Sequence, residues 1–459
     1  MVDFSAQSNC IYSTTKNNHL IKVISNNSLF NGIEKDSLNQ LLSIADLPNI
    51  ADPILGFPDM HVGYGVPIGS AFGSPTSNGI ISSEAVGFDI NCGIRLIKTN
   101  LYKKDVSKEQ LFILLKNLQK LPLGLSQDGI SLSKSQFDDI LLTGVNWCVS
   151  NNFCNSRDKK YIEKNGFLKD AKFDFISSLA IKRGITEVGT LGIGNHFIDI
   201  LEIQEVIDPI VAREFGLSQN QICIMLHTGS RGFGHQIATE FNDAFFYKKP
   251  ISYQEFNSEL GQKYYFSMLA AGNYAFVNRA VLSFKIIDII KKTLNIGHKD
   301  IEFELLYDLC HNIASIEKHN KQDLVVHRKG ATHAVYANDL PAGSVFSKTG
   351  TPIILPGSML WSSYVLVPTK NIEKETMSTV AHGSGRAMSR TSAKQNMSID
   401  SLRKWMAKEN VLLSGKSINT MREEQPNAYK FSEDVVNSMV CAGIVKPVVK
   451  LKPLIVLTG

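Results

Sequence analysis

Five short segments of the chain each place a metal-binding or acid–base side chain next to glycine. They are VGFDINCGIR with Asp89 and Cys92, GTLGIGNHFIDI with Asn195 and His196, LHTGSRGFGHQ with His227 and Arg231, VVHRKGATHA with His327, and AHGSGR with His382. Glycine beside a ligand lets the backbone turn sharply or approach an ion closely. A single histidine is more often an ordinary core or turn residue, so the prediction of a site depends on the five segments together.

Five of these side chains form a candidate metal set of one carboxylate, one thiolate and three imidazoles. They are Asp89, Cys92, His196, His227 and His327. Such donors suit divalent first-row transition metals. Five ligands exceed one tetrahedral shell, so we expect two ions that share the Cys92 thiolate, and ion pairs ~3.5–4 Å apart serve phosphoryl chemistry. The roles of His235 and His311 stay open, while His61 in FPDMHVGYGVPIGS could support the ligands.

His382 stands directly before Gly-Ser-Gly and is followed by Arg386 and Arg390. A turn needs the glycines but neither the histidine nor the arginines. Gly383 and Gly385 would leave room for phosphates and offer backbone N–H donors. Neutral imidazole keeps a lone pair for attack near neutral pH. From these residues alone, a nucleophile and a phosphate-binding turn both remain open for His382.

Strand-like, glycine-rich stretches must position these side chains. Such stretches dominate residues 50–100, 186–240 and 322–366. Four of the five segments follow apolar, strand-like residues, which predicts that the ligands lie at strand ends. Residues 448–459, VVKLKPLIVLTG, are typical of a buried strand.

Helical spacing of apolar residues appears in three other places. It predicts helices over 107–121, behind a serine cap, over 267–294, with room for one break, and over 301–319. Strands and helices interleave without strict βαβ alternation, so we expect a mixed α/β body rather than a doubly wound sheet. Residues 145–185 have the weakest pattern and are interpreted as an insertion or a surface helical excursion.

Composition sets broad limits. A length of 459 residues would ordinarily suggest two or three domains. Hydrophobic residues make up 43% and charged residues 20%, as in ordinary globular proteins. The net charge of +5 permits an anionic partner without requiring one. No apolar run approaches the ~18–20 residues of a membrane helix, so we expect no membrane partner.

The N-terminal sequence and the cysteines bear on the compartment. MVDFSAQSNCIYSTTKNNHL lacks the basic region and apolar core of a signal peptide, which favours the cytoplasm. The seven cysteines show no C-x-x-C pair and no even disulfide framework. We therefore expect reduced thiols throughout.

Seven motifs in their order along the chain resemble the RtcB family of RNA-splicing and RNA-repair ligases. They are PDMHVGYGVPIG, VGFDINCGIR, GTLGIGNHF, HTGSRGFGHQ, VVHRKGATHA, LPGSM and HGSGR. The resemblance extends from about residue 50 to the C-terminus. It implies a mixed α+β fold in one large RtcB-like domain over residues 1–459, with central mixed sheets flanked by helices. Residues 1–49 form an N-terminal part that the motifs do not cover.

The resemblance implies a ligase that joins an RNA 3′-phosphate to a 5′-hydroxyl. In the family, GTP guanylylates a histidine, GMP passes to the RNA 3′-phosphate, and the 5′-hydroxyl then displaces GMP. A 2′,3′-cyclic phosphate end is first hydrolysed, and two Mn²⁺ ions assist. By motif match His382 is the guanylylated residue, and the candidate metal set binds the ions with Cys92 as the bridge. Ligand chemistry alone would favour Zn²⁺, so manganese is implied only by the resemblance.

The resemblance also implies the contacts with the nucleotide. The expected cofactor-binding residues are Asn195, Ser358, Ser363, His382, Gly383, Ser384, Gly385, Arg386 and Tyr429. Asn195 would contact phosphate near the metals, and Tyr429 would stack on the guanine. Arg386 would neutralise charge on the transferred phosphoryl group.

The chain departs from the family pattern around the base pocket. Thr458 stands where the family commonly has lysine, and Asp199 where it usually has glutamate. Leu360 and Trp361 replace small residues, and His333 replaces an arginine. These differences predict a divergent member with a weaker preference for GTP over ATP.

Three functions are compared. The leading hypothesis is a GTP- and Mn²⁺-dependent RNA ligase for 3′-phosphate or 2′,3′-cyclic phosphate and 5′-hydroxyl ends, with an archease-type activator as a further partner. The alternative is a nucleotidyl transferase that caps RNA 3′-phosphates without efficient joining. The third hypothesis is a protein that binds metal and RNA but has lost catalysis. The intact His382 argues against this hypothesis.

Overall fold

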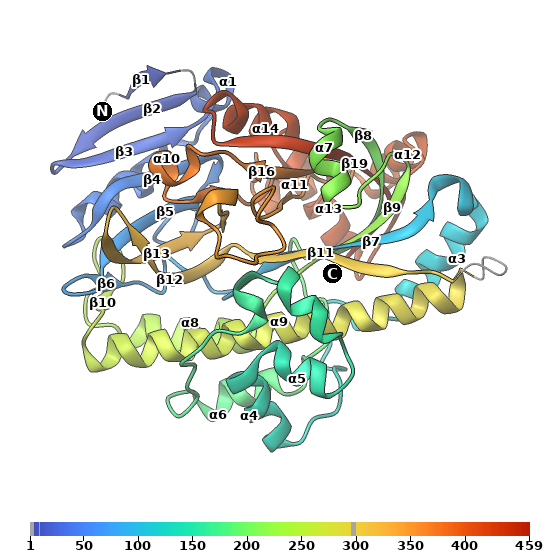
Figure 1. Cartoon of the computed structure of the whole chain (residues 1–459), viewed down its shortest axis with the longest axis horizontal. Helices are drawn as coiled ribbons and strands as arrows, with labels where there is room; N and C mark the ends of the chain where they lie inside the picture. The colour runs from blue at the N-terminus through green and yellow to red at the C-terminus, as the bar shows by residue number, and fades with distance from the viewer. Residues whose placement is uncertain (1–3, 9, 295–299) are drawn as a thin grey trace.

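The computed structural model of the chain describes residues 4–8, 10–294 and 300–459, and two large sheets dominate it (Figure 1). The first sheet has the strand order β1-β2-β3-β4-β5-β13-β12. Its strands are β1 Ser5–Ser8, β2 Ile11–Lys16, β3 His19–Ile24, β4 Ala51–His61, β5 Ile68–Pro75, β12 Asn312–His319 and β13 Gln322–Lys329. Parallel and antiparallel pairs occur together, since β3 pairs with β4 in parallel and most other neighbours are antiparallel.

The second sheet has the order β11-β7-β9-β8-β19-β16-β15, with β18 added in parallel to β19. Its strands are β7 Gly93–Tyr102, β8 Phe197–Val206, β9 Gln221–Thr228, β11 Phe303–Cys310, β15 Ile353–Leu355, β16 Ser363–Pro368, β18 Leu412–Gly415 and β19 Val445–Thr458. Two small pairs complete the strands, β6 Ile80–Ile81 with β10 Gln254–Glu255, and β14 Ala331–His333 with β17 Thr379–Ala381.

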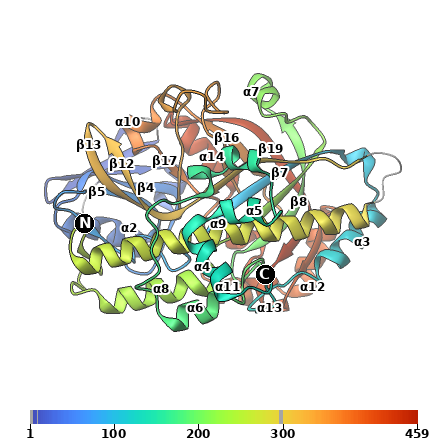
Figure 2. The same cartoon turned by 60° about the horizontal axis from the view of Figure 1, so that its bottom comes forward.

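Helices flank the sheets. The long α9 (Glu259–Thr293) crosses below both sheets in Figure 1, and α8 (Arg231–Ala244) lies beside it in Figure 2. The other α-helices are α1 Asn27–Asn31, α2 Lys35–Ser43, α3 Lys108–Leu118, α4 Lys134–Thr143, α5 Val145–Ser150, α6 Ser178–Gly184, α7 Pro209–Glu214, α10 Ile372–Thr376, α11 Arg390–Asn396, α12 Ile399–Lys408, α13 Ile418–Glu423 and α14 Ser432–Cys441. Among the described residues, no helix has the length and apolar character needed to cross a membrane.

These elements form one mixed α/β domain, so the predicted fold class is confirmed and the two or three domains suggested by length are wrong. The central α9 explains the difference. Its residues pack into the core below the first sheet and into the core of the second, as Tyr274 and Ile286 illustrate. A helix buried against both sheets leaves no solvated boundary at which the chain could divide.

Three predicted elements are confirmed. The helix over 107–121 is α3, and Ser107 caps it with Gln110 in a reciprocal pair, Gln110 N–H to Ser107 Oγ at 3.2 Å and Ser107 N–H to Gln110 Oε1 at 2.8 Å. The C-terminal strand is β19, buried along most of its length. The helix predicted over 267–294 is α9, which continues without a break.

The helix predicted over 301–319 is wrong. This stretch forms the antiparallel strands β11, which pairs with β7, and β12, which pairs with β13. Short apolar runs satisfy helical and strand spacing alike, and pairing with neighbouring strands decides the outcome here. His311 lies between the two strands, and this position becomes important for the site.

The prediction that every cysteine is reduced is wrong for one pair. Cys10 and Cys441 form a disulfide with a Cα–Cα distance of 5.8 Å. They are 431 residues apart. Asn26 lies close to Cys10 across a strand pair and donates its N–H to Ser438 Oγ of α14 at 2.9 Å. This contact brings Cys10 to α14. Spacing along the chain carries no sign of such a contact.

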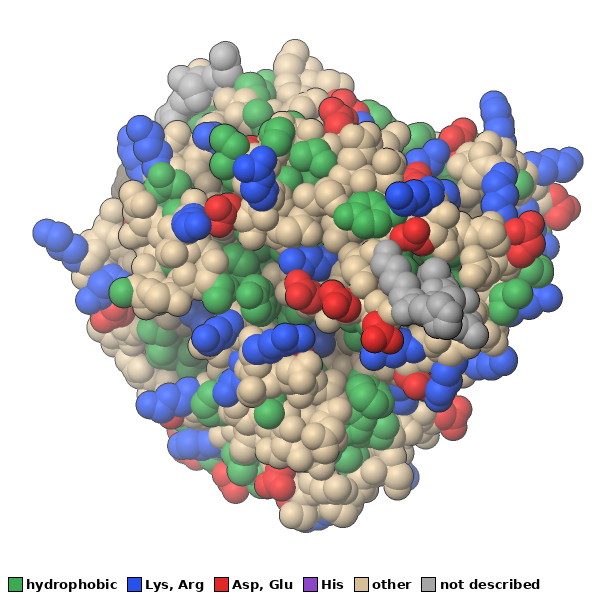
Figure 3. Space-filling view, turned by 45° about the vertical axis from the view of Figure 1, so that its right-hand side comes forward, with side chains coloured by type: hydrophobic (Ala, Val, Ile, Leu, Met, Phe, Trp, Pro, Cys, Tyr) green, Lys and Arg blue, Asp and Glu red, His purple; other side chains and the backbone are tan. Residues whose placement is uncertain are grey.

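The segment 145–185 is helical and packed on the body. It contains α5, α6 and the 3₁₀ helices η3 Ser156–Tyr161 and η4 Glu163–Gly166. Trp147, Ile162 and Ile176 are buried in the same core cluster as α9. On the face shown in Figure 3, lysine and arginine lie scattered among aspartate and glutamate rather than in one patch, as the modest net charge predicts.

Candidate active site

The register of the second sheet brings several predicted ligand segments to one edge. Gly93, at the start of β7, pairs with Cys310 on β11 and with Thr228 on β9. Phe197, at the start of β8, pairs with His227. The residues at or beside these paired positions are Cys92, His196, His227 and His311. Strand pairing therefore places a thiol and three imidazoles side by side.

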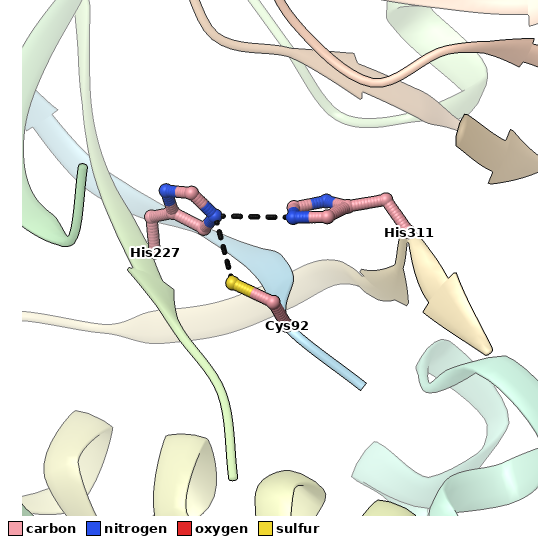
Figure 4. Close-up of side chains that lie close together, drawn as sticks. All are labelled: Cys92, His227 and His311. Carbon is pink, nitrogen blue, oxygen red and sulfur yellow. Dashed lines mark hydrogen bonds between the residues drawn. The ribbon is translucent and has the colours of Figure 1, made fainter. Parts of the chain in front are cut away.

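Two overlapping triads result, each with donor atoms within 4.8 Å of one another. Their members are Cys92, His227 and His311 for one, and Asp89, Cys92 and His196 for the other. Cys92 Sγ lies 3.2 Å from His227 Nε2 and 3.4 Å from His196 Nε2. His227 Nε2 lies 3.2 Å from His311 Nε2 (Figure 4), and Asp89 Oδ2 lies 2.8 Å from His196 Nε2. Donors around one ion at about 2.0–2.3 Å have similar separations, so the geometry fits two cations that share Cys92.

The imidazoles are oriented for ligation through Nε2. His196 Nδ1 lies 2.9 Å from the Leu191 carbonyl, and His227 Nδ1 lies 2.9 Å from the Asn195 carbonyl. A proton held on Nδ1 leaves the lone pair on Nε2. Burial, together with neighbouring imidazoles, lowers the pKa of His227 and of His311 well below the ordinary value. Both rings are therefore neutral, the form that binds a metal.

The two acidic donors, Asp89 and Cys92, have opposite net pKa shifts. Burial raises the pKa of Asp89, but the hydrogen bond with His196 and the nearby Arg231 charge outweigh it and hold this pKa below its usual range. Burial and the Asp89 charge raise the pKa of Cys92 well above the ordinary value. A bound cation reverses this effect on a thiol, so metal binding here would release a proton.

A buried ion pair fixes the loop that carries Asp89 and Cys92. The Cys92 N–H donates to the Asp89 carbonyl at 3.0 Å across a tight turn, with Asn91 at a φ of 53°. Arg279 of α9 donates to the Asn91 carbonyl at 2.7 Å and pairs with Asp308 at 2.7 Å. The helix thus holds the turn in a conformation that asparagine tolerates better than most residues.

The structure does not place His327 with the other predicted ligands. His327 lies within β13, where its Nε2 accepts the Ser82 N–H at 3.2 Å and its ring stacks on Phe72 at 4.6 Å. The third imidazole of the cluster is His311, so the structure corrects the predicted cluster and makes His311 the candidate ligand in place of His327. The apolar, strand-like run before His311 is a usable signal for a ligand at a strand end. However, no glycine flanks His311, and the spacing of the run also predicts a helix.

We expect His311→Ala to lower the bound metal by about one equivalent and His327→Ala to leave it near normal. The reason is that His311 belongs to one triad, whereas His327 has its Nε2 occupied by a backbone N–H. Elemental analysis of both purified variants, after reconstitution with the same metal, measures the difference. Equal metal loss from the two variants would contradict this correction.

His382 lines the same cavity as the Cys92 thiol and lies beside His311, with ring centroids 4.9 Å apart. Its Nδ1 is 2.6 Å from Asp59 Oδ2, and its backbone N–H donates to the same oxygen at 3.1 Å. Gly385 (φ 68°) lies so close to the Asp59 carbonyl that a Cβ there would approach it to 2.0 Å. Asp59 thus fixes the ring and leaves Nε2 with the free lone pair. Reasoning from the sequence missed Asp59, although it stands in the glycine-rich stretch with His61.

A cavity of about 860 Å³ joins the metal cluster to His382. Its lining includes Asp89, Cys92, Asn195, His196, His227, His311, His382, Gly383, Ser384, Gly385, Arg386, Ser358, Tyr429, Asp199, Thr458 and His61. Most of the residues predicted for metal and cofactor binding therefore share one space. Burial lowers the pKa of His61 to about 4, so this ring is neutral.

Ser358 and Ser363 have different surroundings. Ser358 lines the cavity, and its Oγ lies 3.4 Å and 3.3 Å from the N–H groups of Leu360 and Trp361. Ser363 is buried behind the same loop and accepts the Gly357 N–H at 3.0 Å. Ser363 therefore supports the loop.

Arg386 and Tyr429 form one network around Glu424. Arg386 Nη1 lies 3.2 Å from a Glu424 oxygen, its Nη2 donates to the Glu423 carbonyl at 2.8 Å, and the guanidinium lies 5.2 Å from the centre of the Tyr429 ring. The Tyr429 hydroxyl donates to Glu424. The ring is thus fixed in the wall of the cavity, with Arg386 over one of its faces.

Two of the base-pocket departures, Asp199 and Thr458, line the cavity on neighbouring strands. Asp199 on β8 pairs in register with Val456 on β19, two residues before Thr458. Asp199 Oδ1 is buried without a hydrogen-bond partner among the described residues, and burial raises its pKa well above the usual value. Such a group calls for donors from a ligand. His333, by contrast, lies outside this cavity, between Glu163 at 3.7 Å and Glu317 at 3.8 Å.

Comparison with known proteins gives a consistent result. A family model described as tRNA-splicing ligase RtcB matches residues 40–459. A tRNA-splicing ligase RtcB of Archaeoglobus fulgidus is 36% identical over 448 residues, covering 93% of this chain and 92% of the relative. Proteins of the same description from Methanococcus maripaludis and Thermococcus kodakarensis are each 36% identical, covering 94% and 95% of this chain and 93% and 94% of the relatives.

Proposed function

This chain belongs to the RtcB family, and we propose that it is an RNA ligase that joins 3′-phosphate or 2′,3′-cyclic phosphate ends to 5′-hydroxyl ends. One observation carries the proposal. His382, with its Nδ1 held by Asp59, faces the same cavity as the two cysteine-sharing triads. A nucleophile and a cation site in one cavity are what phosphoryl transfer needs.

From a 3′-phosphate end the proposed reaction has three steps, and a 2′,3′-cyclic phosphate end is first hydrolysed to the 3′-phosphate. His382 Nε2 attacks the α-phosphorus of GTP, the N–P bond forms, and pyrophosphate leaves. An oxygen of the RNA 3′-phosphate then attacks the same phosphorus, so that GMP moves to the RNA end and His382 is restored. Finally the RNA 5′-hydroxyl attacks the 3′-phosphate phosphorus and GMP leaves. Asp59 holds the Nδ1 proton and stabilises positive charge on the ring during the first two steps.

We propose two Mn²⁺ ions as the metals, held by Asp89, Cys92 and His196 at one position and by Cys92, His227 and His311 at the other. Bound cations would neutralise charge on phosphate oxygens and lower the pKa of an attacking hydroxyl. Asn195 is exposed at the cavity wall, and its carbonyl fixes His227. Its side chain remains our proposed phosphate contact near the metals.

An adduct assay tests the function. The protein is incubated with Mn²⁺ and each labelled NTP, and a denaturing gel reports covalent nucleotide. RNA bearing a 3′-phosphate and RNA bearing a 5′-hydroxyl are then added. Joined strands support the ligase, whereas accumulation of capped 3′-ends alone would favour a nucleotidyl transferase. Adding an archease-type activator to the same reaction tests whether such a partner is needed.

The base pocket yields a specificity prediction. A charged hydrogen bond is worth about 1.5–3 kcal/mol, or roughly 10–150-fold in binding. Asp199 keeps a carboxylate for the guanine N1–H and N2–H₂ edge, but Thr458 offers no long donor, and stacking on Tyr429 is nearly independent of the base. We expect a weak preference for GTP over ATP, which Thr458→Lys raises by about 10-fold or more.

Relative adduct yields with GTP and ATP measure this preference. Thr458→Val is the matched control, because it removes the hydroxyl, whose bond to the Ser414 carbonyl is long at 3.5 Å, and adds no donor. Strict GTP dependence that Thr458→Lys leaves unchanged would assign the selectivity to Asp199 or to backbone groups.

A further inference from the structure

Three rings form a continuous row at the metal end of the cavity. The Tyr64 and Phe88 ring centres lie 5.4 Å apart, and Phe88 stacks on His235 of α8 at 5.0 Å with planes 25° apart. Tyr64 and Phe88 line the cavity, and Phe88 directly precedes Asp89 of the metal cluster. The middle ring of the row therefore lies next to the metal cluster in the chain.

The rings at both ends of the row are exposed to solvent. Tyr64 is 57% exposed, and His235 is also exposed. Packing into the core therefore does not explain the position of the Tyr64 ring. Val62, two residues earlier, also lines the cavity and is 41% exposed, and apolar surface gathered at a cavity is a feature of ligand-binding sites.

The backbone that carries Tyr64 is held firmly. Lys329 Nζ donates to the Tyr64 carbonyl at 2.6 Å and to the Val66 carbonyl at 2.8 Å. Gln40 of α2 exchanges two hydrogen bonds with Gly63, at 2.7 Å and 3.0 Å. The buried lysine and the glutamine thus fix a loop whose ring points outward. A partner that stacks on this ring would meet a preorganised surface.

Positive charge lies in the same cavity. Arg390 lines the wall with a side chain that is 54% exposed, and its guanidinium lies close to Gly194, next to the exposed Asn195. It also pairs with Glu423 at 3.9 Å and with Glu424 at 3.8 Å. Cations in the two triads would add to the positive charge. Aromatic rings combined with positive charge are the usual means of binding single-stranded nucleic acid.

We propose that Tyr64, Phe88 and His235 form a stacking platform for unpaired bases of the RNA strand whose end lies at the metal centre. The inference rests on the proposed RNA-joining function and deepens it. It assigns the preferred substrate as RNA with single-stranded ends, because bases can stack on this platform only when they are not paired in a duplex.

Binding of fluorescent RNA tests the platform. The probe is an unstructured 3′-phosphorylated decaribonucleotide, compared with the same strand in a blunt duplex, on the full-length Mn²⁺-loaded protein. We expect Tyr64→Ala to weaken single-strand binding about 5- to 150-fold, with little effect on the duplex, and Tyr64→Phe to restore the affinity. We expect the slope of log affinity against log salt concentration to stay unchanged in Tyr64→Ala and to become shallower in Arg390→Ala. Only the arginine neutralises a phosphate and so releases counterions when RNA binds.

Phe112→Ala is the matched control, because Phe112 is 49% exposed on α3 and its ring carries Lys116 at 4.5 Å, outside the cavity. It should bind both probes like the unchanged protein. Unaltered single-strand binding by Tyr64→Ala, or equal losses for strand and duplex, would overturn the platform. Adduct formation by the unchanged protein reports separately on the proposed function, so a failure there is distinguishable from a failure of the platform.

Discussion

Replacing His382 with alanine is expected to abolish the covalent nucleotide adduct and to leave the metal content near normal. The imidazole supplies the attacking nitrogen, which alanine removes. His382 also belongs to neither triad, although its ring lies 4.9 Å from that of His311. Labelled GTP with a denaturing gel measures the adduct, and elemental analysis measures the metal.

Two further variants sharpen this prediction. Asp59→Asn keeps the shape of the carboxylate but removes its charge and allows the wrong ring tautomer, so we expect adduct formation to slow by about 10²–10⁴-fold. His19→Ala is the matched control, because His19 also has a carboxylate 3.1 Å from its Nδ1, that of Asp52, but lies outside the cavity. An acid-labile adduct that persists in His382→Ala would identify another residue as the nucleophile.

Removal of the Cys92 thiolate is expected to cost more than one metal equivalent. Its Sγ is the only donor common to both triads of the described residues, so Cys92→Ala weakens both positions at once. Loss of an outer-shell partner typically costs 10–100-fold, and we expect ligation activity to fall beyond that range. Metal analysis after reconstitution with Mn²⁺, together with ligation of labelled RNA, measures both effects.

Cys223→Ala provides the matched control for Cys92→Ala. Cys223 is also a buried thiol of the second sheet, on β9, but it belongs to neither triad. Its loss should leave the metal content unchanged and lower stability only through packing. Retention of two ions by Cys92→Ala would overturn the shared-ligand arrangement.

Local signals in the sequence predicted much of the fold and part of the site. The Ser107 cap with Gln110 three residues later marked α3, and the apolar run at the C-terminus marked β19. Such features depend on neighbouring residues, so they can be seen without tertiary structure. The glycine-flanked Cys92, His196 and His227 were identified for the same reason, and the structure places them within contact of one another.

The tertiary structure decided what depends on pairing between distant segments. His311 joins the cluster, and His327 does not, because β11 pairs with β7 and puts its end beside Cys92. Asp59 reaches His382 across 323 residues. Cys10 and Cys441 meet although nothing in their spacing suggests it. Strand register and long-range packing set these contacts, and one sequence read along its length reveals residue types and local periodicity but not which strands become neighbours.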